Sequence, residues 1–203
     1  MIRNVWAVGR NYTEHAKELG NFASSADSDP MIFLKAGTSV VDESRPFRLP
    51  AFSQDVHHEV ELALRFGRNL AFDAMALSID LTARDLQNKL KSQGHPWTLA
   101  KSFQDATLLG AFAPVTSKID LRNITFELRI NGELRQSGNT KDMVHSAEKL
   151  RSFVLARFPV VEGDLLLTGT PAGVGPVRRG DVLEAGGSAG LLPATWRAAS
   201  TPD

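Results

Sequence analysis

The fold of this chain is decided by the stretch Asp55-Val-His-His-Glu-Val-Glu-Leu-Ala-Leu-Arg-Phe66, in which apolar and polar side chains alternate. Successive side chains of a β-strand point to opposite faces of its sheet. Val60 and Leu62 therefore share an apolar face, and Glu59 and Glu61 share the opposite one. The stretch predicts a strand that buries one face and presents two carboxylates on the other.

Further strands and a few helices are predicted on both sides of this stretch. Apolar runs or alternation predict strands over 2–8, 31–35, 75–81, 165–167 and 182–183, and Asn131-Gly132 predicts a hairpin between strands 124–130 and 133–136. Helices are predicted over 11–19 with Asn11 as N-cap, over 82–91 with Thr82 as N-cap, and over 142–158. Strands outnumber helices, so we expect a β-rich α+β fold with few short helices.

The composition excludes several classes of protein. The chain has 203 residues, 23 Lys plus Arg, 23 Asp plus Glu and no cysteine. Balanced charge argues against nucleic-acid binding, and the lack of cysteine excludes disulfides, thiolate nucleophiles and cysteine-bound metals. No apolar run approaches the ~18 residues of a membrane span, and no signal peptide is recognised, which predicts a cytoplasmic protein without membrane partners. We expect one domain over residues 1–196 and a disordered tail over 197–203.

Three acidic residues are candidate metal ligands. Glu59 and Glu61 lie two positions apart on one strand, so their side chains point the same way. Their Cα atoms are about 6.5–7 Å apart. Asp80 ends another predicted strand. Carboxylate oxygens suit Mg²⁺ and Mn²⁺. Spacing alone, however, favours a simpler explanation: a solvated strand face, and a surface pair between Asp80 and Arg84.

Other candidates for chemistry are weaker on their own. His15 and Glu18 are neighbours on the first predicted helix, a pairing that suits a general base but is common on surfaces. Lys101 lies in a largely apolar stretch and needs an anionic partner, either a substrate or a structural Asp. The glycine-rich segment Thr168–Pro176 could donate backbone N–H groups to an anion, although it matches neither a Walker A loop nor a dinucleotide motif.

Six motifs, taken in order, give the chain a resemblance to a known family. Together they resemble the fumarylacetoacetate hydrolase superfamily, most closely its acylpyruvate hydrolase and oxaloacetate decarboxylase/tautomerase branch, from Ile2 to about Ala185. The motifs are Gly9-Arg-Asn-Tyr-x-x-His15-x-x-Glu18, Phe33-Leu-Lys35, His57-His-Glu59-Val-Glu61-Leu62, Asp80-Leu-Thr-Ala-Arg84-Asp-Leu-Gln87, Pro96-Trp-Thr-Leu-Ala-Lys101-Ser-Phe103 and Leu167-Thr-Gly-Thr-Pro-x-Gly-Val-Gly-Pro176.

The resemblance implies a fold and a site. The fold would be the mixed β-roll or sandwich of the family's C-terminal domain, usually a homodimer, and residues 21–30 fall where the family has a mobile lid. Mg²⁺ or Mn²⁺ would be held by Glu59, Glu61 and Asp80. The implied catalytic residues are His15, Glu18 and Lys101, and the implied substrate-binding residues are Arg10, Tyr12, Lys35, Arg84, Gln87 and Thr170.

The activity implied is hydrolysis of the C–C bond of acylpyruvates or related 2,4-dioxo acids. Water activated by His15 would attack the distal carbonyl while pyruvate enolate leaves. The same site would also allow oxaloacetate decarboxylation or keto–enol tautomerisation, or isomerisation or decarboxylation of a 2-hydroxy-diene-dioate. Because the connection from Glu61 to Asp80 is shorter than the family leads us to expect, a non-catalytic metal or ligand binder is the second alternative.

Overall fold

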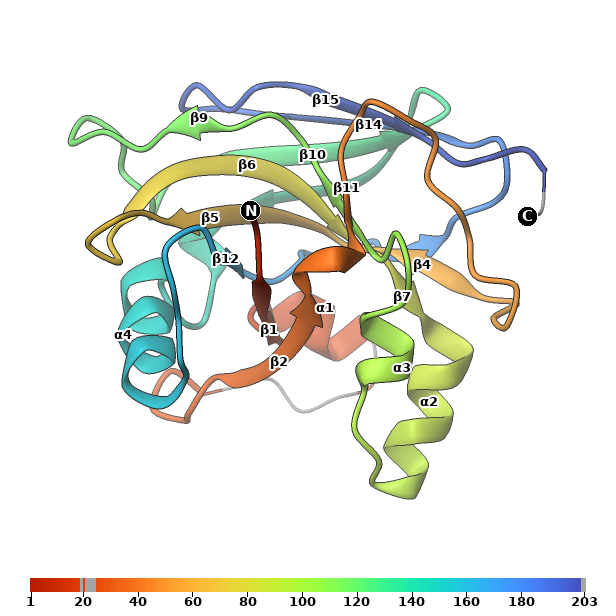
Figure 1. Cartoon of the computed structure of the whole chain (residues 1–203), viewed down its shortest axis with the longest axis horizontal. Coiled ribbons are helices and arrows are strands. Elements are labelled where there is room, and N and C mark those ends of the chain that lie inside the picture. The colour runs from red at the N-terminus through yellow and green to blue at the C-terminus, as the bar shows by residue number, and fades with distance from the viewer. Residues whose placement is uncertain (19, 21–24, 202–203) are drawn as a thin grey trace.

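The described residues form three β-sheets, with most of the helices along one side (Figure 1). The computed structural model describes residues 1–18, 20 and 25–201. The largest sheet has the strand order β2 (Met31–Ala36), β1 (Asn4–Gly9), β12 (Leu165–Leu167), β5 (Val60–Phe66), β6 (Phe72–Asp80), β8 (Thr107–Leu109) and β3 (Val40–Val41), and β9 (Ala113–Pro114) also pairs with β6.

Two smaller sheets complete the architecture. One has the order β11 (Glu133–Asn139), β10 (Thr125–Ile130), β14 (Val182–Gly187) and β15 (Ala194–Arg197). The other has the order β13 (Gly175–Pro176), β4 (Val56–His58) and β7 (Thr82–Ala83). This arrangement confirms the predicted β-rich class.

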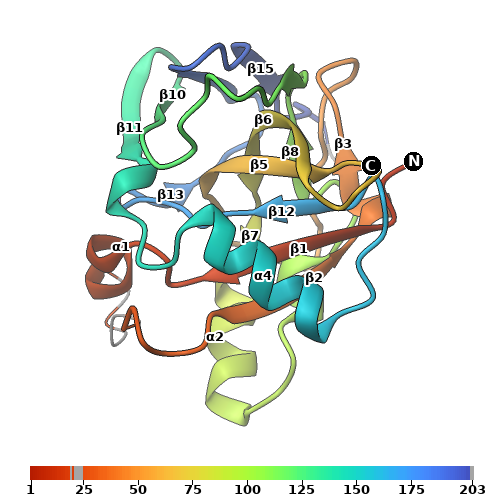
Figure 2. The ribbon, with the colours of Figure 1, turned by 90° about the vertical axis from the view of Figure 1, so that its left-hand side faces the viewer.

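The helices are α1 (Thr13–Glu18), α2 (Arg84–Gln93), α3 (Thr98–Lys101) and α4 (Ala147–Arg157), with 3₁₀ turns at Gly37–Ser39 and Thr140–Asp142. In Figure 1, α2 and α3 project below the sheets on one side and α4 lies on the other. Figure 2 shows α4 in front of β1, and Phe158, which follows α4, stacks on Trp6 of β1 with ring centroids 4.9 Å apart. Within the described chain, no helix combines the length and apolar character that a membrane crossing needs.

The decisive strand is buried on both faces. Val60, Leu62 and Leu64 belong to the main apolar core, as the alternation predicts. The opposite face is not solvated, however: Glu61 is 1% exposed and Ala63 is fully buried. A solvated face was therefore the wrong explanation for the paired carboxylates, because further elements cover this side of the sheet.

The short connection between Glu61 and Asp80 is a hairpin. β5 pairs antiparallel with β6, with Val60 opposite Ile79, and the Asp80 N–H donates to the Glu59 carbonyl at 2.8 Å. In this register Glu59, Glu61 and Asp80 lie on one face of the two strands. The shortening therefore does not separate the candidate ligands.

Two predicted helix caps are wrong. Asn11 does not cap α1; its Oδ1 accepts from the His145 N–H at 2.8 Å, and its Nδ2 donates to the Thr168 carbonyl at 2.8 Å. Thr82 belongs to β7, and α2 begins two residues later, at Arg84. Asn and Thr side chains bind backbone groups of any kind, so tertiary partners compete with capping.

Two predicted boundaries also change. The helix expected over 142–158 begins at Ala147 and is capped by Ser146, whose side chain accepts from the Lys149 N–H. A disordered tail was expected from Arg197. Its predicted start is too early, because Arg197 belongs to β15 and Ala198 is fully buried. Pro202 and Asp203 lie outside the described residues, as do residues 21–24 of the predicted lid; the lid's mobility stays a prediction.

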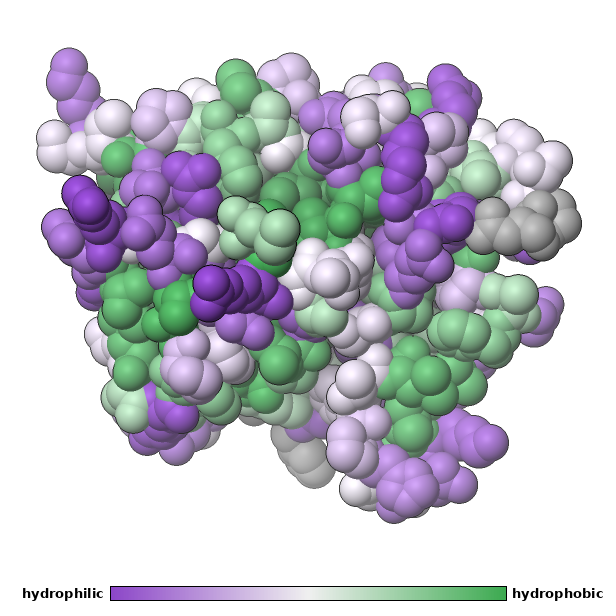
Figure 3. Space-filling view, in the orientation of Figure 1, coloured by the Kyte–Doolittle hydropathy of each residue, from purple (hydrophilic) through white to green (hydrophobic). Residues whose placement is uncertain are grey.

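Large apolar side chains are exposed at two neighbouring elements. Leu34 of β2 is 44% exposed and Leu99 of α3 is 54% exposed. Figure 3 shows hydrophobic residues gathered on the surface over these two elements. β2 is also an edge strand of the largest sheet.

Candidate active site

Three carboxylates converge at the ends of β5 and β6. Glu59, Glu61 and Asp80 each offer an oxygen within 4.8 Å of the others'. They are 4%, 1% and 0% exposed. Glu59 occupies the break between β4 and β5, and Asp80 is the last residue of β6. Antiparallel pairing is what places residues 59 and 80 side by side.

The Lys101 ammonium lies among these carboxylates. Its Nζ donates to Glu59 Oε2 at 2.7 Å, to Asp80 Oδ2 at 2.6 Å and to Thr82 Oγ1 at 2.6 Å. Burial alone would lower the pKa of Lys101, but the charges of Asp80 and Glu59 outweigh it and raise that pKa above its ordinary value. Lys101 is therefore a permanently charged group at neutral pH.

Two further cations hold the carboxylates from outside the cluster. Arg84 Nη2 binds Glu59, and Arg84 Nη1 donates to Gln87 Oε1 at 2.5 Å. Lys35 is fully buried, binds Asp80, and donates to the Ala106 carbonyl at 2.8 Å. Buried carboxylates of this kind need such partners, because isolated buried charge is strongly unfavourable.

Glu61 differs electrostatically from Glu59. Burial, together with the charges of Asp80 and Glu59, raises the pKa of Glu61 well above its ordinary value. For Glu59, the charges of Lys101 and Arg84 outweigh burial and hold the pKa well below its ordinary value. Three buried carboxylates offering closely spaced oxygens fit a hard divalent cation, which would relieve their mutual repulsion.

His15 and Glu18 of α1 lie beside the cluster. His15 is 6% exposed, and its Nδ1 is 3.5 Å from Glu18 Oε2. Burial lowers the pKa of His15, so the imidazole is neutral at neutral pH and can accept a proton. Glu18 also accepts from the Gly173 N–H, at 3.1 Å to Oε1, which ties α1 to the glycine-rich segment.

The glycine-rich segment donates backbone N–H groups to two carboxylates of the protein itself. The Gly169 N–H donates to Glu61 Oε2 at 2.5 Å, and Gly173 donates to Glu18. Gly169 has φ +95° and Gly173 has φ +98°, a region that favours glycine. The segment therefore orients one candidate metal ligand and one member of the histidine pair.

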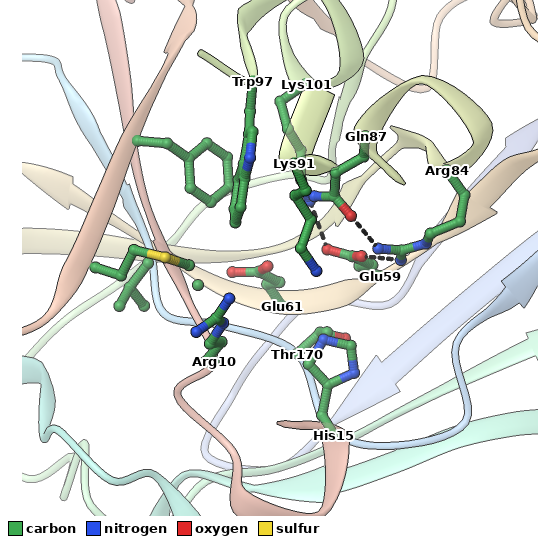
Figure 4. A pocket seen from close by; sticks show the side chains of 14 residues that line it. Arg10, His15, Glu59, Glu61, Arg84, Gln87, Lys91, Trp97, Lys101 and Thr170 are labelled. Atoms are coloured by element: carbon green, nitrogen blue, oxygen red, sulfur yellow. Dashed lines mark hydrogen bonds and ion pairs between the residues drawn. The ribbon is translucent and has the colours of Figure 1, made fainter. Parts of the chain in front are cut away.

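One cavity opens onto this cluster. Figure 4 shows Glu59 held by Arg84, with Gln87 beside it; Lys91 extends from the side of Gln87 and Lys101, and Arg10 lies on the opposite side of Glu61. Eight of the residues singled out in the sequence line the cavity: Arg10, His15, Glu59, Glu61, Arg84, Gln87, Lys101 and Thr170.

Four of the singled-out residues do not line the cavity. Lys35 and Asp80 are fully buried behind it, and Glu18 reaches it through His15. Tyr12 is 3% exposed with a buried hydroxyl that has no partner among the described residues. Neither Lys35 nor Tyr12 lines the cavity, and contact of either side chain with a substrate stays a prediction.

Sequence reasoning missed two polar residues of the site. Gln136 of β11 is 1% exposed; its Oε1 accepts from the Val60 N–H at 3.0 Å and lies 2.9 Å from His58 Nδ1. Its Nε2 donates to Thr170 Oγ1 and to the Pro171 carbonyl, both at 2.8 Å. Gln136 thus links Val60, the residue between the two glutamates, to Thr170. Lys91 of α2 also lines the cavity.

Comparison with known proteins agrees with this geometry. Residues 4–195 match the family described as fumarylacetoacetate (FAA) hydrolase C-terminal. The chain belongs to the fumarylacetoacetate hydrolase family. This confirms the resemblance noted from the six motifs.

Relatives in this family differ in their named activities. The chain is 42% identical over 194 residues to oxaloacetate tautomerase FAHD1, mitochondrial, of Bos taurus, covering 91% of this chain and 86% of the relative. It is 37% identical over 195 residues to oxaloacetate decarboxylase, mitochondrial, of Dictyostelium discoideum, covering 91% and 88%. It superposes with a TM-score of 0.90 and 28% identity on fumarylpyruvate hydrolase from Pseudomonas aeruginosa in complex with Mn²⁺ and pyruvate, covering 98% and 91%.

Proposed function

We propose that this chain is a divalent-metal-dependent enzyme that interconverts the keto and enol forms of oxaloacetate or a closely related 2-oxo acid. The observation that carries the proposal is the cluster of buried carboxylates Glu59, Glu61 and Asp80. Two of them, Glu59 and Glu61, line one cavity together with Lys101 and a neutral His15. The names of the relatives support tautomerisation better than the C–C hydrolysis expected from the sequence.

The three carboxylates would hold the metal, either Mg²⁺ or Mn²⁺. Bound there, the ion would supply Lewis-acid polarisation of the substrate's C2 carbonyl. The three carboxylates and the cations Lys35, Arg84 and Lys101 formally cancel, so a divalent ion leaves an excess of positive charge for an anionic substrate. A Mn²⁺ complex of a relative supports this assignment.

The protein's own residues would move one proton and stabilise one oxyanion. Conversion of the keto form to the enol breaks a C3–H bond and forms an O–H bond at C2. His15 is proposed to accept the C3 proton, because burial lowers its pKa and keeps it neutral. Lys101, charged and held by Glu59 and Asp80, would stabilise the oxygen of the enolate.

Hydrolysis of acylpyruvates is the second candidate. The contact between His15 and Glu18 favours it, because a carboxylate beside an imidazole orients a base that activates water. The similarity to a fumarylpyruvate hydrolase also supports it. Decarboxylation of oxaloacetate needs neither a base nor an attacking water and would use the same site.

The test is the conversion of enol to keto oxaloacetate, followed by the enol's ultraviolet absorbance, with Mg²⁺ or Mn²⁺. We expect the wild type to exceed the rate with the same metal alone. We expect Glu59→Ala to lose more than about 100-fold, since partners outside the ligand set alone are worth 10–100-fold. Glu133→Ala, at an exposed position on β11, is the matched control.

Two outcomes would contradict the proposal. Metal binding without acceleration of tautomerisation, but with cleavage of acetylpyruvate, would favour the hydrolase. No stabilisation of the protein by Mg²⁺, Mn²⁺ or oxalate in thermal melts would favour the non-catalytic alternative. The homodimer, the cytoplasmic location and the absence of nucleic-acid partners stay predictions; the mass in solution tests the first.

A further inference from the structure

The buried amide of Gln136 has four neighbours within hydrogen-bond distance. Its Oε1 accepts from the Val60 N–H at 3.0 Å and lies 2.9 Å from His58 Nδ1. Its Nε2 donates to Thr170 Oγ1 and to the Pro171 carbonyl, both at 2.8 Å. Among the seven described residues of β11, Gln136 is the one that is buried. An apolar side chain would have served burial alone, so burial does not account for an amide at this position.

Two backbone groups fix which way round this amide lies. The Val60 N–H can only donate and the Pro171 carbonyl can only accept, so Oε1 faces the first and Nε2 faces the second. Because Nε2 carries donors and no acceptor, Thr170 Oγ1 is the acceptor in its bond with Gln136. The hydrogen of the Thr170 hydroxyl is therefore left for a second partner.

Thr170 carries this polarity into the cavity. It is 3% exposed and lines the cavity with Glu59 and Glu61. In Figure 4 it lies on the same side of the two glutamates as His15. A hydroxyl whose oxygen already accepts a bond acts toward the cavity as a donor. The partner that suits it is an acceptor oxygen, and a negatively charged oxygen forms the stronger bond.

The backbone that carries Thr170 has little room to move relative to β11. A Cβ on Gly173 would overlap the Arg135 carbonyl oxygen, and a Cβ on Gly138 would lie 2.9 Å from the Pro171 side chain. Contacts this close keep the glycine-rich segment against the strand. The amide therefore acts on a hydroxyl whose surroundings are already fixed, so that one hydrogen bond is enough to set its direction.

We propose that Gln136 is a positioning residue, which holds the Thr170 hydroxyl as a hydrogen-bond donor to an anionic oxygen of the substrate. This role rests on the proposed function, in which a 2-oxo acid occupies the cavity. The oxygen that Thr170 meets would be that of a carboxylate or an enolate. Gln136 belongs to a different sheet from Glu61, so the orientation of this donor depends on how the two sheets pack.

The test is a double-mutant cycle that is read by binding, without turnover. The affinity of the Mn²⁺-loaded protein for oxalate is measured by calorimetry for wild type, Gln136→Met, Thr170→Val and the double variant. Methionine is close to glutamine in size and valine is close to threonine, so each substitution removes polar atoms and little volume. Gln93→Met, at an exposed position at the end of α2, is the matched control.

We expect Thr170→Val to weaken oxalate binding about tenfold, as for a hydrogen bond to a charged group. Gln136→Met should weaken it about threefold or more, within the range for side chains that share a network. Once Thr170 is replaced by valine, Gln136→Met should cause no further loss, because the amide then has no hydroxyl to orient. Mn²⁺ affinity should not change, and Thr170→Ser and Gln93→Met should bind oxalate as wild type does.

Gln136→Glu keeps the test decisive if Gln136→Met fails to fold. It retains the acceptor for the Val60 N–H and places an oxygen where Nε2 was, so the Thr170 hydroxyl would turn to donate to residue 136. Oxalate affinity should then fall at least as far as in Thr170→Val.

Three results would overturn the proposal. They are unchanged oxalate affinity in Gln136→Glu or Thr170→Val, an equal loss from Gln136→Met with and without the Thr170 hydroxyl, and no binding of oxalate to the wild type. An equal loss in both backgrounds is what a purely structural role predicts. Coupling between the two residues would establish the role even if oxaloacetate were not converted, and tautomerisation without coupling would remove this role alone.

Discussion

At the scale of single residues, the site depends on different protonation states of neighbouring groups. His15 is kept neutral by burial, whereas Lys101 is kept charged by Asp80 and Glu59. A neutral base and a fixed cation on one cavity suit transfer of a proton away from carbon with stabilisation of the resulting oxyanion. The two roles can be separated by substitution.

Replacing His15 should separate proton transfer from decarboxylation. His15→Asn removes the proposed base, so we expect tautomerisation, and any hydrolysis of acylpyruvates, to fall by about 10²–10⁴-fold. Decarboxylation of oxaloacetate needs no base and should be largely retained. Rates of all three reactions on the Mn²⁺-loaded variant check this, and equal losses in all three would show that the division of roles is wrong.

The pH profile gives an independent check on His15. Because burial lowers the pKa of His15, its neutral form persists at pH values below about 6.5, the ordinary pKa of histidine. We expect the acid limb of kcat/KM, which reports the free enzyme, to lie below that value for wild type and to be absent from the residual kcat/KM of His15→Asn.

At the scale of elements, two strands bring the carboxylates together and a turn orients one of them. β5 and β6 place Glu59, Glu61 and Asp80 side by side, but the Gly169 N–H holds the Glu61 carboxylate. A Cβ on Gly169 would lie 2.8 Å from Asn11 Cβ, and Asn11 itself ties this turn to residue 145. The turn has no room to adjust.

Gly169→Ala should therefore weaken metal binding. With φ +95° and a close contact, alanine must displace the turn and with it the donor to Glu61. We expect Mn²⁺ affinity to fall about 10–100-fold, the range for partners of metal ligands. Gly94→Ala is the matched control: its φ is +67°, a Cβ there meets nothing within 4 Å, and only stability should drop. Unchanged Mn²⁺ affinity in Gly169→Ala would count against this role.

At the scale of the whole molecule, Asp105 joins loops that support the site. Asp105 is 2% exposed and accepts from Arg45 Nη2 at 2.6 Å and from the Arg48 N–H at 2.9 Å. It directly precedes Ala106, whose carbonyl accepts from Lys35. Burial would raise the pKa of Asp105, but hydrogen bonds from Arg45 and Arg48 outweigh it and lower that pKa.

Asp105→Asn should destabilise the fold in a pH-dependent way. Its folded-state pKa is lowered, so the carboxylate's contribution is present above the unfolded value of about 3.9 and is lost as pH falls through the folded value. In urea unfolding we expect a loss of about 2 kcal/mol near pH 7 that shrinks below about pH 4. Asparagine tolerates the φ of +62° at this position.

The control for Asp105 is Asp73→Asn. Asp73 pairs with Arg65 at 2.9 Å on the surface, where such pairs are worth less than about 1 kcal/mol. A loss for Asp105→Asn that equalled that of Asp73→Asn, or that stayed constant down to pH 3, would contradict the assigned role.

Local patterns in the sequence determined much of this protein. The alternation around Glu59 predicted β5 and its apolar face, Asn131-Gly132 predicted the β10–β11 hairpin, and the ordered motifs predicted the family. These features depend on neighbours in the chain, through the two-residue period of a strand and the geometry of tight turns.

Only the tertiary structure decided how these parts act together. It buried the glutamate face, drew Asn11 away from capping α1, and brought Gln136 and Lys91 to the site from β11 and α2. Gln136 and Lys91 belong to no sequence motif that identifies them as site residues. The partners of such polar side chains come from segments distant in sequence. Burial and charge pairing, the forces that set the protonation of this site, exist only once those segments have packed.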